Sequence, residues 1–306
     1  MQQLEVRDPA TDEVIRVLDV TPIDQLPAIF ARVRSAQTHW ARFSPRDRAR
    51  KLLDLREAIL NHLDELVDLI SKENGKPRTE TLSCDLLPSV ELLTYFARRG
   101  GRLLKDQRVH IRNPLLQHRS STLQYWPLGV VAVISPWNFP FLLPFGEIAM
   151  ALVAGNGVVF KPSEYTPLVG LKIQELCEEA GFPPGIIQTV VGDGKVGAAI
   201  IDQKPNKIFF TGSVPTGKRI MEAAAKHLIP VCLELGGKDP MIVLADADLD
   251  YASSAALFGG FVNSGQVCAS TERIIVHESV AKPFLDKLTV KLAKLRQGPS
   301  IGQDND

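Results

Sequence analysis

The chain has 306 residues, and its 35 basic residues balance its 35 acidic residues. This length suits two domains, or one domain with appendages, and the balanced charge argues against a nucleic-acid or anionic-membrane partner. The hydrophobic content of 45% is ordinary for a soluble globular protein. The amino terminus lacks the apolar core of a secretion signal, and the longest apolar region, residues 141–160, is interrupted by Pro144 and Glu147. We therefore expect a cytoplasmic protein that does not span a membrane.

The first hundred residues have a helical pattern. Apolar positions recur three and four residues apart over Asp24–Phe43 and Pro45–Ile70, and a third helix is expected over Thr79–Leu104. Ser44 before Pro45 is typical of a helix start. Residues 1–107 are thus predicted to be the helical part of the first domain, followed by an extended hairpin over residues 108–127.

From Leu128 onward, short β-branched runs alternate with helical segments. The runs lie at Val130–Ile134, Gly157–Phe160, Ile186–Val191 and Lys207–Phe210, with helices expected near residues 145–153, 167–180, 195–202 and 216–226. Runs without polar alternation are typical of strands buried on both faces, and this rhythm predicts βαβ units with a parallel sheet. Residues 128–235 are therefore expected to form a doubly wound α/β core. Ligands bind such sheets at the carboxyl ends of the strands.

A second region is expected over residues 236–306. Its hydrophobic pattern predicts a strand at Met241–Leu244, a helix that ends near Phe261, a strand at Ile274–His277 and a helix from Val280 to Leu295. A polar stretch follows to the end of the chain.

Cys268 is the cysteine whose surroundings favour chemistry, because small and polar residues flank it and Gly265 lies three positions before it. Cys84, Cys177 and Cys232 fit ordinary packing, the commonest role of a free cysteine. The four cysteines have no paired metal spacing, which indicates reduced thiols and no metal site. A reactive thiolate needs a base or a positive environment, and Glu234 is the nearest upstream carboxylate in an apolar, glycine-rich setting.

Two strand ends carry polar side chains suited to ligands. Asn138 follows the first strand of the sheet, where its amide is a candidate donor to a developing oxyanion; taken alone, an ordinary loop asparagine is the better interpretation. Lys161 and Glu164 follow the second strand and are suited to gripping the two hydroxyls of a ribose. A surface ion pair, with Ser163 as a helix cap, explains the latter residues equally well.

The segment after the fourth run, Lys207–Phe210, is a near match to the phosphate-binding loop G-x-x-x-x-G-K-[ST]. Arg219 stands where the magnesium-binding hydroxyl belongs, and Pro215 removes a backbone donor, so we reject a nucleoside triphosphatase. A strand end followed by a helix start is still well suited to bind a pyrophosphate, and this segment consists of Thr211, Gly212 and Ser213. The ordinary dinucleotide fingerprint G-x-G-x-x-G is absent.

Together these segments resemble the NAD(P)+-dependent aldehyde dehydrogenase superfamily. The resemblance rests on five motifs in the family's order, and also on the opening at Arg7–Thr11. The motifs are Pro136–Pro140, Phe160–Glu164, Phe210–Ser213, Leu233–Lys238 and Gly265–Cys268. Each motif is modest alone, but the set is highly specific. It implies an aldehyde dehydrogenase-like α/β fold: a doubly wound parallel-sheet NAD(P)-binding domain, then an α/β catalytic domain that begins at residue 236 and is truncated here.

The resemblance also implies roles for individual residues. Cys268 is the nucleophile that attacks an aldehyde, Asn138 with the Cys268 backbone N–H holds the oxyanion, and Glu234 activates water to release the acid. The cofactor, NAD or NADP, is expected to contact a set of residues around the strand ends. That set is Ser135, Pro136, Trp137, Lys161, Ser163, Glu164, Gly194, Thr211, Gly212, Ser213, Leu235 and Gly236. The hairpin over residues 108–127 is expected to serve oligomerisation, with a homodimer or homotetramer in a full-length form.

The chain departs from the family pattern after the cysteine. The Glu-x-Phe-Gly-Pro segment that grips the nicotinamide ribose and the tail strand used in oligomerisation have no match. We expect a fragment of a longer protein, rather than a natural truncation, with poor turnover as it stands. A non-catalytic nucleotide-binding or scaffolding remnant is the alternative function. A CoA-acylating enzyme is disfavoured because Glu234 supplies a base for thioester hydrolysis.

Overall fold

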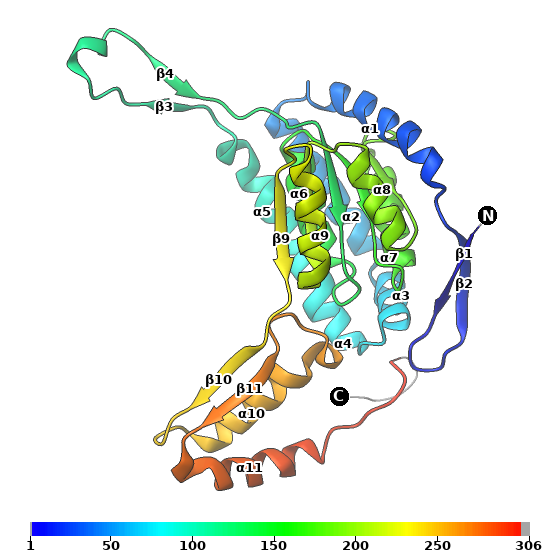
Figure 1. Ribbon diagram of the computed structural model, residues 1–306, viewed down its shortest axis with the longest axis vertical. Helices are drawn as coiled ribbons and strands as arrows, with labels where there is room; N and C mark the ends of the chain where they lie inside the picture. Colours follow the sequence, from blue (N-terminus) through cyan, green and yellow to red (C-terminus); the bar gives the residue numbers. More distant parts are fainter. Residues whose placement is uncertain (1, 301–306) are drawn as a thin grey trace.

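A five-stranded parallel sheet forms the centre of the computed structural model, which describes residues 2–300 (Figure 1). The strands lie in the order β7-β6-β5-β8-β9. Their bounds are β5 Val130–Ile134, β6 Gly157–Lys161, β7 Ile187–Thr189, β8 Lys207–Gly212 and β9 Val231–Leu235. All five residues of β5 and of β6 are buried, which confirms the expectation from their β-branched runs. The alternation of strand and helix thus produces the doubly wound α/β fold.

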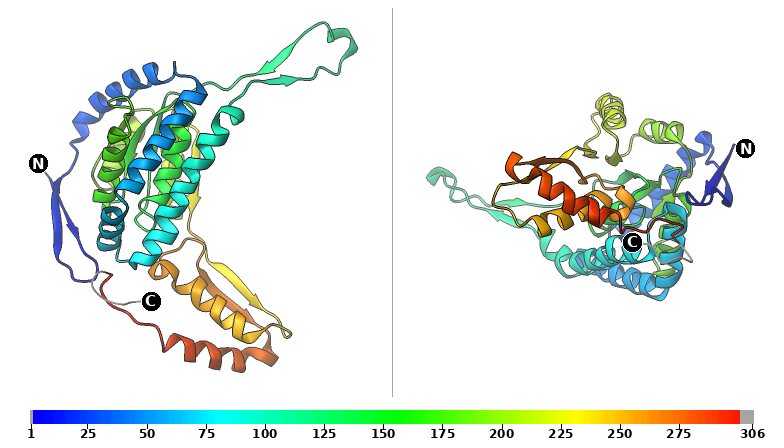
Figure 2. Two further views of the ribbon diagram at one scale, coloured as in Figure 1. Left: turned by 180° about the vertical axis from the view of Figure 1, so that it is seen from behind. Right: turned by 90° about the horizontal axis from the view of Figure 1, so that it is seen from below.

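Helices cover both faces of this sheet (Figure 2). On one face, Val131 and Val133 pack against the helices α2 (Pro45–Asn61), α5 (Leu87–Leu103), α6 (Leu142–Val153) and α7 (Pro167–Glu179). On the other face, Val130 and Ala132 pack against α1 (Leu26–Trp40), α8 (Gly194–Asp202) and α9 (Val214–Ala225). Successive residues of a strand point to opposite faces, so the uninterrupted apolar runs serve two cores.

The amino-terminal region differs from the expectation in three places. An antiparallel hairpin, β1 (Gln3–Arg7) with β2 (Val14–Asp19), precedes a short 3-10 turn, η1 (Ile23–Gln25). The helix expected over Pro45–Ile70 breaks at His62 into α2 and α3 (Leu63–Asn74). The helix expected over Thr79–Leu104 is a short α4 (Arg78–Glu80), a π-helical segment η2 (Thr81–Leu86) and then α5. Apolar periodicity continues through such local changes of winding and therefore does not reveal them.

The expected hairpin after α5 is present and projects away from the body of the molecule (Figure 1). Its strands β3 (Gln107–Val109) and β4 (Ser121–Leu123) are antiparallel, and a 3-10 turn η3 (Pro114–Leu116) lies between them. Its side chains are exposed on both strands.

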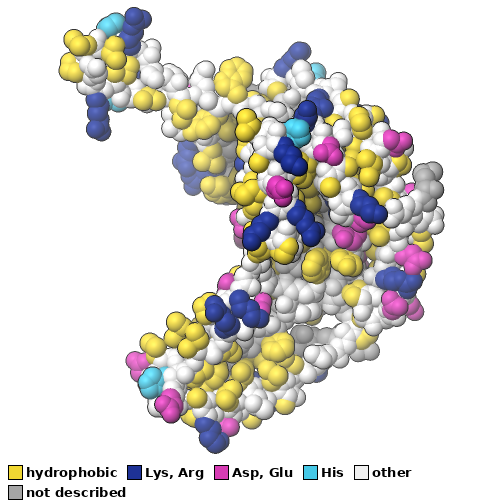
Figure 3. All heavy atoms as spheres, in the orientation of Figure 1, with side chains coloured by type: hydrophobic (Ala, Val, Ile, Leu, Met, Phe, Trp, Pro, Cys, Tyr) yellow, Lys and Arg dark blue, Asp and Glu magenta, His cyan; other side chains and the backbone are white. Residues whose placement is uncertain are grey.

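The second region is smaller and more open. The strand β10 (Asp239–Val243) pairs in parallel with β11 (Thr271–Val276), and the helices α10 (Leu249–Phe261) and α11 (Glu278–Leu292) pack on them. A short 3-10 segment, η4 (Val262–Gly265), connects α10 to the loop before β11. The space-filling view shows hydrophobic side chains gathered on the surface of this region (Figure 3). The end of the expected domain, residues 301–306, lies outside the described residues.

Candidate functional site

A cleft of about 970 Å³ opens at the carboxyl ends of the strands. β5 lies between β6 and β8, so the chain winds in one direction from β5 to β7 and in the other from β8 to β9. Ligands of open α/β sheets bind where the winding reverses. The loop before β11 supplies the opposite wall through Gln266, Val267 and Cys268. The cleft is therefore the place where the sheet and the second region meet.

All but one of the residues expected at the site line this cleft. Of the three expected catalytic residues, Asn138 and Cys268 line it and Glu234 does not. The expected cofactor contacts all line it: Ser135, Pro136, Trp137, Lys161, Ser163, Glu164, Gly194, Thr211, Gly212, Ser213, Leu235 and Gly236.

Lys161 and Glu164 form a partly buried charged pair at the end of β6. The Lys161 ammonium is buried, donates to the Pro162 carbonyl at 2.8 Å and lies 3.7 Å from the Glu164 carboxylate. Burial lowers the pKa of Lys161, and the charges of Glu164 and Asp193 oppose this shift. A cation and a carboxylate held side by side present both a donor and an acceptor to a ligand hydroxyl.

The floor of the cleft has room for a ligand close to the backbone. A Cβ atom at Gly194 or Gly236 would meet nothing within 4 Å, whereas one at Gly212 would lie 2.6 Å from the Phe210 ring. Gly212 is thus required by packing, and the other two leave open space beside the chain. The Ser135 hydroxyl is buried and has no hydrogen-bond partner within the protein. A buried polar group without a partner calls for an explanation, and a polar ligand in the cleft would provide one.

The amino terminus of α9 faces the cleft through Ser213 and Thr216. Ser213 caps the helix, because its hydroxyl oxygen accepts from the Thr216 backbone N–H at 3.4 Å. The free N–H groups of a helix start and the helix dipole favour an anion. This is the arrangement expected for a pyrophosphate.

Cys268 is exposed in a turn ahead of β11. The Asn138 side chain reaches towards the same loop and donates from Nδ2 to the Gln266 carbonyl at 2.9 Å. An amide nitrogen carries two hydrogens, so one remains for a ligand after this bond is made. The fold therefore brings a thiol and an amide donor to one cleft from segments about 130 residues apart.

Glu234 is exposed near the end of β9, and its neighbours Leu235 and Gly236 line the cleft. Leu233 and Leu235 pack towards one face of the sheet, so Glu234 points to the other face. There it comes near Glu147 of α6, which sequence reasoning did not single out as functional. The only signal was a lone carboxylate in an otherwise apolar helix.

Glu147 has a buried carboxyl oxygen, Oε2, without a hydrogen-bond partner. Burial raises the pKa of Glu147 to about 8, the Glu234 charge adds to the rise, and the Thr211 side chain opposes it. This carboxyl therefore holds a proton near neutral pH, below the strand ends that form the cleft.

The remaining cysteines match the packing interpretation. Cys177 is fully buried, and burial raises the pKa of its thiol; Cys84 and Cys232 are partly buried. Within residues 2–300, no three His, Cys, Asp or Glu side chains cluster in a way that could hold a metal. None of the helices in that range combines the length and apolarity needed to cross a bilayer.

Comparisons with known proteins agree with this arrangement. The chain is 42% identical over 287 residues to a 4,4'-diapolycopene aldehyde oxidase from a Methylomonas species, covering 92% of this chain and 54% of that protein. A crystal structure of PnpE in complex with nicotinamide adenine dinucleotide superimposes with a TM-score of 0.93 at 32% identity, covering 98% of this chain and 61% of the other. An NADP-dependent enzyme from E. coli gives 0.93 at 31% identity, with coverages of 99% and 62%.

The chain thus spans little more than half the length of the relatives that it matches. The profile of the aldehyde dehydrogenase family matches residues 1–306. The chain belongs to the aldehyde dehydrogenase family.

Proposed function

We propose that this chain carries the cofactor-binding domain and the nucleophile of an NAD(P)+-dependent aldehyde dehydrogenase, which oxidises an aldehyde to a carboxylic acid. The observation that carries the proposal is the convergence of Cys268 and the Asn138 amide on one cleft at the switch point of the sheet. The similar proteins include an aldehyde oxidase and an enzyme with bound NAD, which supports the same chemistry.

The residues of the cleft fit a dinucleotide. Lys161 and Glu164 would hold the adenosine ribose, the start of α9 at Ser213 would face the pyrophosphate, and the unsatisfied Ser135 hydroxyl would gain a partner. A dinucleotide held by these residues would supply a hydride acceptor next to Cys268. Glu164 favours the unphosphorylated ribose of NAD, while Lys161 and Ser163 leave room for NADP.

The protein's own groups supply covalent and acid-base catalysis. The Cys268 thiolate attacks the aldehyde carbon to form a thiohemiacetal, and the Asn138 amide with the Cys268 backbone N–H stabilises its oxyanion. Glu234 takes the thiol proton and later activates the water that hydrolyses the thioester. Because Glu234 lies outside the cleft wall, this role requires its exposed side chain to turn towards Cys268.

A single-turnover experiment tests the proposal on this chain. The purified protein is mixed with NAD+ or NADP+ and a panel of aldehydes, and the acyl adduct on Cys268 is sought by mass spectrometry together with the absorbance of reduced cofactor. We expect a stoichiometric adduct in Glu234→Gln, where hydrolysis of the thioester is blocked, and we expect Cys268→Ser in the same background to remove it. Cofactor binding without any adduct, and a Cys268 thiol that iodoacetamide does not alkylate near neutral pH, would instead establish the non-catalytic scaffold.

We further propose that the β3–β4 hairpin mediates homo-oligomer formation. Leu115 is 82% exposed and Trp126 is 78% exposed on this projecting element, and such apolar exposure marks interaction surfaces. Sedimentation velocity of the chain and of Leu115→Glu tests this. A monomer at all concentrations for the unchanged chain contradicts it.

A further inference from the structure

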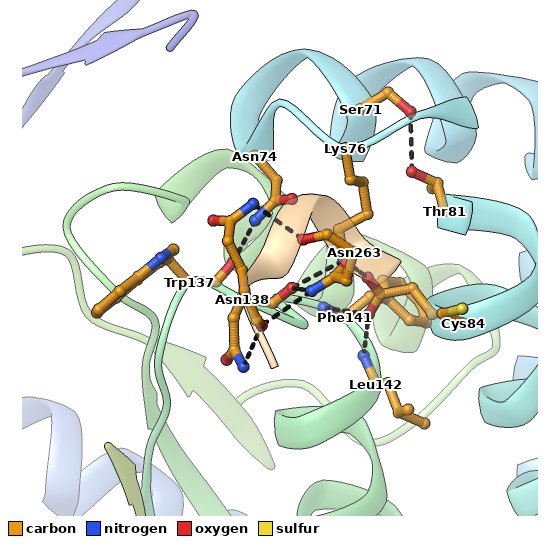
Figure 4. Close-up of polar contacts among 12 residues, drawn as sticks. Ser71, Asn74, Lys76, Thr81, Cys84, Trp137, Asn138, Phe141, Leu142 and Asn263 are labelled. Carbon is orange, nitrogen blue, oxygen red and sulfur yellow. Dashed lines mark hydrogen bonds and ion pairs between the residues drawn. The ribbon is translucent and has the colours of Figure 1, made fainter. Parts of the chain in front are cut away.

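The backbone carbonyl of Asn138 is held from two sides (Figure 4). The Lys76 ammonium donates to it at 2.8 Å, and the Asn263 amide donates to it at 2.9 Å. Lys76 comes from the segment after α3, and Asn263 comes from η4, just ahead of Cys268. One peptide group therefore joins the loop that carries the amide donor to the loop that carries the nucleophile.

Lys76 belongs to a fully buried ion pair. Its ammonium lies 2.5 Å from the Asp85 carboxylate, and neither side chain is exposed to solvent. Asp85 also accepts from the backbone N–H groups of Phe141 and Leu142, at 3.3 and 2.8 Å. The Lys76 ammonium sits 4.5 Å from the Phe139 ring centroid. The pair thus holds the loop from Asn138 to Leu142 at both ends.

A buried ion pair is poor evidence for stability. Removing two charges from water costs about as much as their attraction returns, and apolar replacements are often neutral or stabilising. Asp85 lies in the π-helical segment η2. π-helical winding is rare overall, but where it occurs it is often at a functional site. The Lys76–Asp85 pair is therefore better explained by where it places the loop than by the free energy of unfolding.

Asn263 carries backbone strain of its own. Its φ is 58°, and that of Ser264 is 56°, so two consecutive non-glycine residues occupy the left-handed region. Non-glycine residues in this region are strained, and they persist where the surrounding structure holds them there. The buried Asn263 amide also donates to the Gln266 carbonyl at 3.1 Å. Burial raises the pKa of Glu80, and the backbone N–H groups of Asn263 and Ser264 oppose that rise.

The same Gln266 carbonyl accepts from the Asn138 side chain. The Gln266 carbonyl can accept a hydrogen bond only from the nitrogen of the Asn138 side-chain amide. This bond therefore fixes Nδ2, and not Oδ1, towards the loop. Asn263 helps to hold the Gln266 carbonyl in place, and the hydrogen bond to that carbonyl sets the direction of the second Nδ2–H of Asn138.

We propose that Asn263 and the Lys76–Asp85 pair are positioning residues that hold the Asn138 amide in register with Cys268 for oxyanion stabilisation. This inference rests on the proposed function, because it assigns the geometry of that same site. None of the three residues lines the cleft. Lys76 and Asn263 act through the backbone carbonyls of Asn138 and Gln266, and Asp85 acts through Lys76.

Two reactions of Cys268 separate positioning from plain reactivity, and neither needs the cofactor. With p-nitrophenyl acetate, the thiolate sulfur bonds to the ester carbon, a tetrahedral oxyanion forms, and the C–O bond breaks to release p-nitrophenolate. With iodoacetamide, the sulfur displaces iodide and no oxyanion forms. The ratio of the acylation rate to the alkylation rate therefore reports on the oxyanion site alone. Cys268→Ala gives the background for both reactions.

Asn263→Gly and Ser264→Gly form a matched pair of variants. Both put glycine at a left-handed position and relieve the same strain, but only the first removes the amide that holds the two carbonyls. We expect Asn263→Gly to lower the acylation rate by about 10-fold to 100-fold, which does not exceed the rate loss caused by removing a whole oxyanion donor. The alkylation rate should not change. Ser264→Gly should change neither rate.

The double variant Lys76→Met with Asp85→Leu tests the ion pair without leaving one buried charge alone. We expect it to fold and to lose acylation selectively, as Asn263→Gly does. If neither Asn263→Gly nor the double variant loses acylation selectively, while Asn138→Ala still lowers the acylation rate, this inference is overturned and the proposed function stays intact. If Asn138→Ala itself changes nothing, the proposed function fails as well.

Discussion

The sheet β5–β9 and the pair β10–β11 are built from similar residues and end in different environments. Val130–Ile134 of β5 is buried throughout, whereas Ile274 and Ile275 of β11 are exposed. Two large clusters of buried residues cover the sheet, and the second region has a cluster of four: Val243, Ala252, Ala256 and Phe284. An apolar strand is therefore only as buried as its neighbours make it.

The cleft lies on the boundary between these two regions. Its floor and the expected cofactor contacts come mainly from strand ends of the well-covered sheet, and its thiol comes from the loop that leads into β11. Sites on strands are held more firmly than sites on loops. The cofactor side is thus built into the sheet, while the nucleophile side depends on the contacts among Asn138, Asn263 and Gln266.

The largest expected effect comes from truncating equivalent rings in the two regions. Phe160→Ala in β6 removes a fully buried ring and should lower the free energy of unfolding by about 3–5 kcal/mol. Phe258→Ala in α10 removes a ring that is 70% exposed and should change it by less than about 0.5 kcal/mol. Urea denaturation of the two variants measures both values. Equal losses would show that the two regions do not differ as described.

The sequence predicted the sheet and the cleft well because both depend on local signals. Each buried strand is a β-branched run, and Asn138, Lys161 and Gly212 lie at or just after the ends of such runs, so that they converge on the cleft through topology alone. The interactions that hold the site are different. Lys76 and Asn263 meet Asn138 from distant parts of the chain, and Asp85 pairs with Lys76; no periodicity encodes such contacts.

The next expected effect is on the pH dependence of stability, and it belongs to the sheet region. Burial raises the pKa of both Glu73 and Glu147 to about 8 from an ordinary 4.5. Between these values the native state keeps protons that the unfolded state has lost, so stability falls as the pH rises from about 4.5 to about 8. The slope approaches about 1.4 kcal/mol per pH unit for each such group.

Glu147→Gln should therefore make the decline of stability with pH shallower. Thermal unfolding midpoints between pH 5 and pH 8 measure the slope. A slope that Glu147→Gln leaves unchanged would mean that this carboxyl is ionised in the folded protein.

Two helix caps test whether the regions unfold together. Ser213 caps α9 beside the sheet, and Asp248 caps α10 in the second region, each through its side-chain oxygen. Replacing either residue with alanine should lower the free energy of unfolding of its region by about 1 kcal/mol. We expect the small core of the second region to unfold first, so that Asp248→Ala moves an early transition and Ser213→Ala a later one.

Circular dichroism follows both regions, and the fluorescence of buried Trp40 follows the sheet once Trp126 and Trp137 are replaced with phenylalanine. The early transition should appear in circular dichroism only. A single transition, shifted equally by both variants in both signals, would mean that the small region is as firmly held as the large one.

The smallest expected effect concerns the surfaces, where the two regions should not differ. Lys51–Asp54 on α2 and Lys282–Asp286 on α11 are exposed ion pairs at 2.9 and 2.7 Å. Asp54→Asn and Asp286→Asn should each lower stability by less than about 0.5 kcal/mol, because solvent screens both pairs. In about 1 M salt, where the Debye length is near 3 Å, both losses should disappear. The Lys51–Asp54 side chains are 38% and 47% exposed, against 85% and 63% for Lys282–Asp286, so a larger loss at Asp54 than at Asp286 would be the effect of that lower exposure.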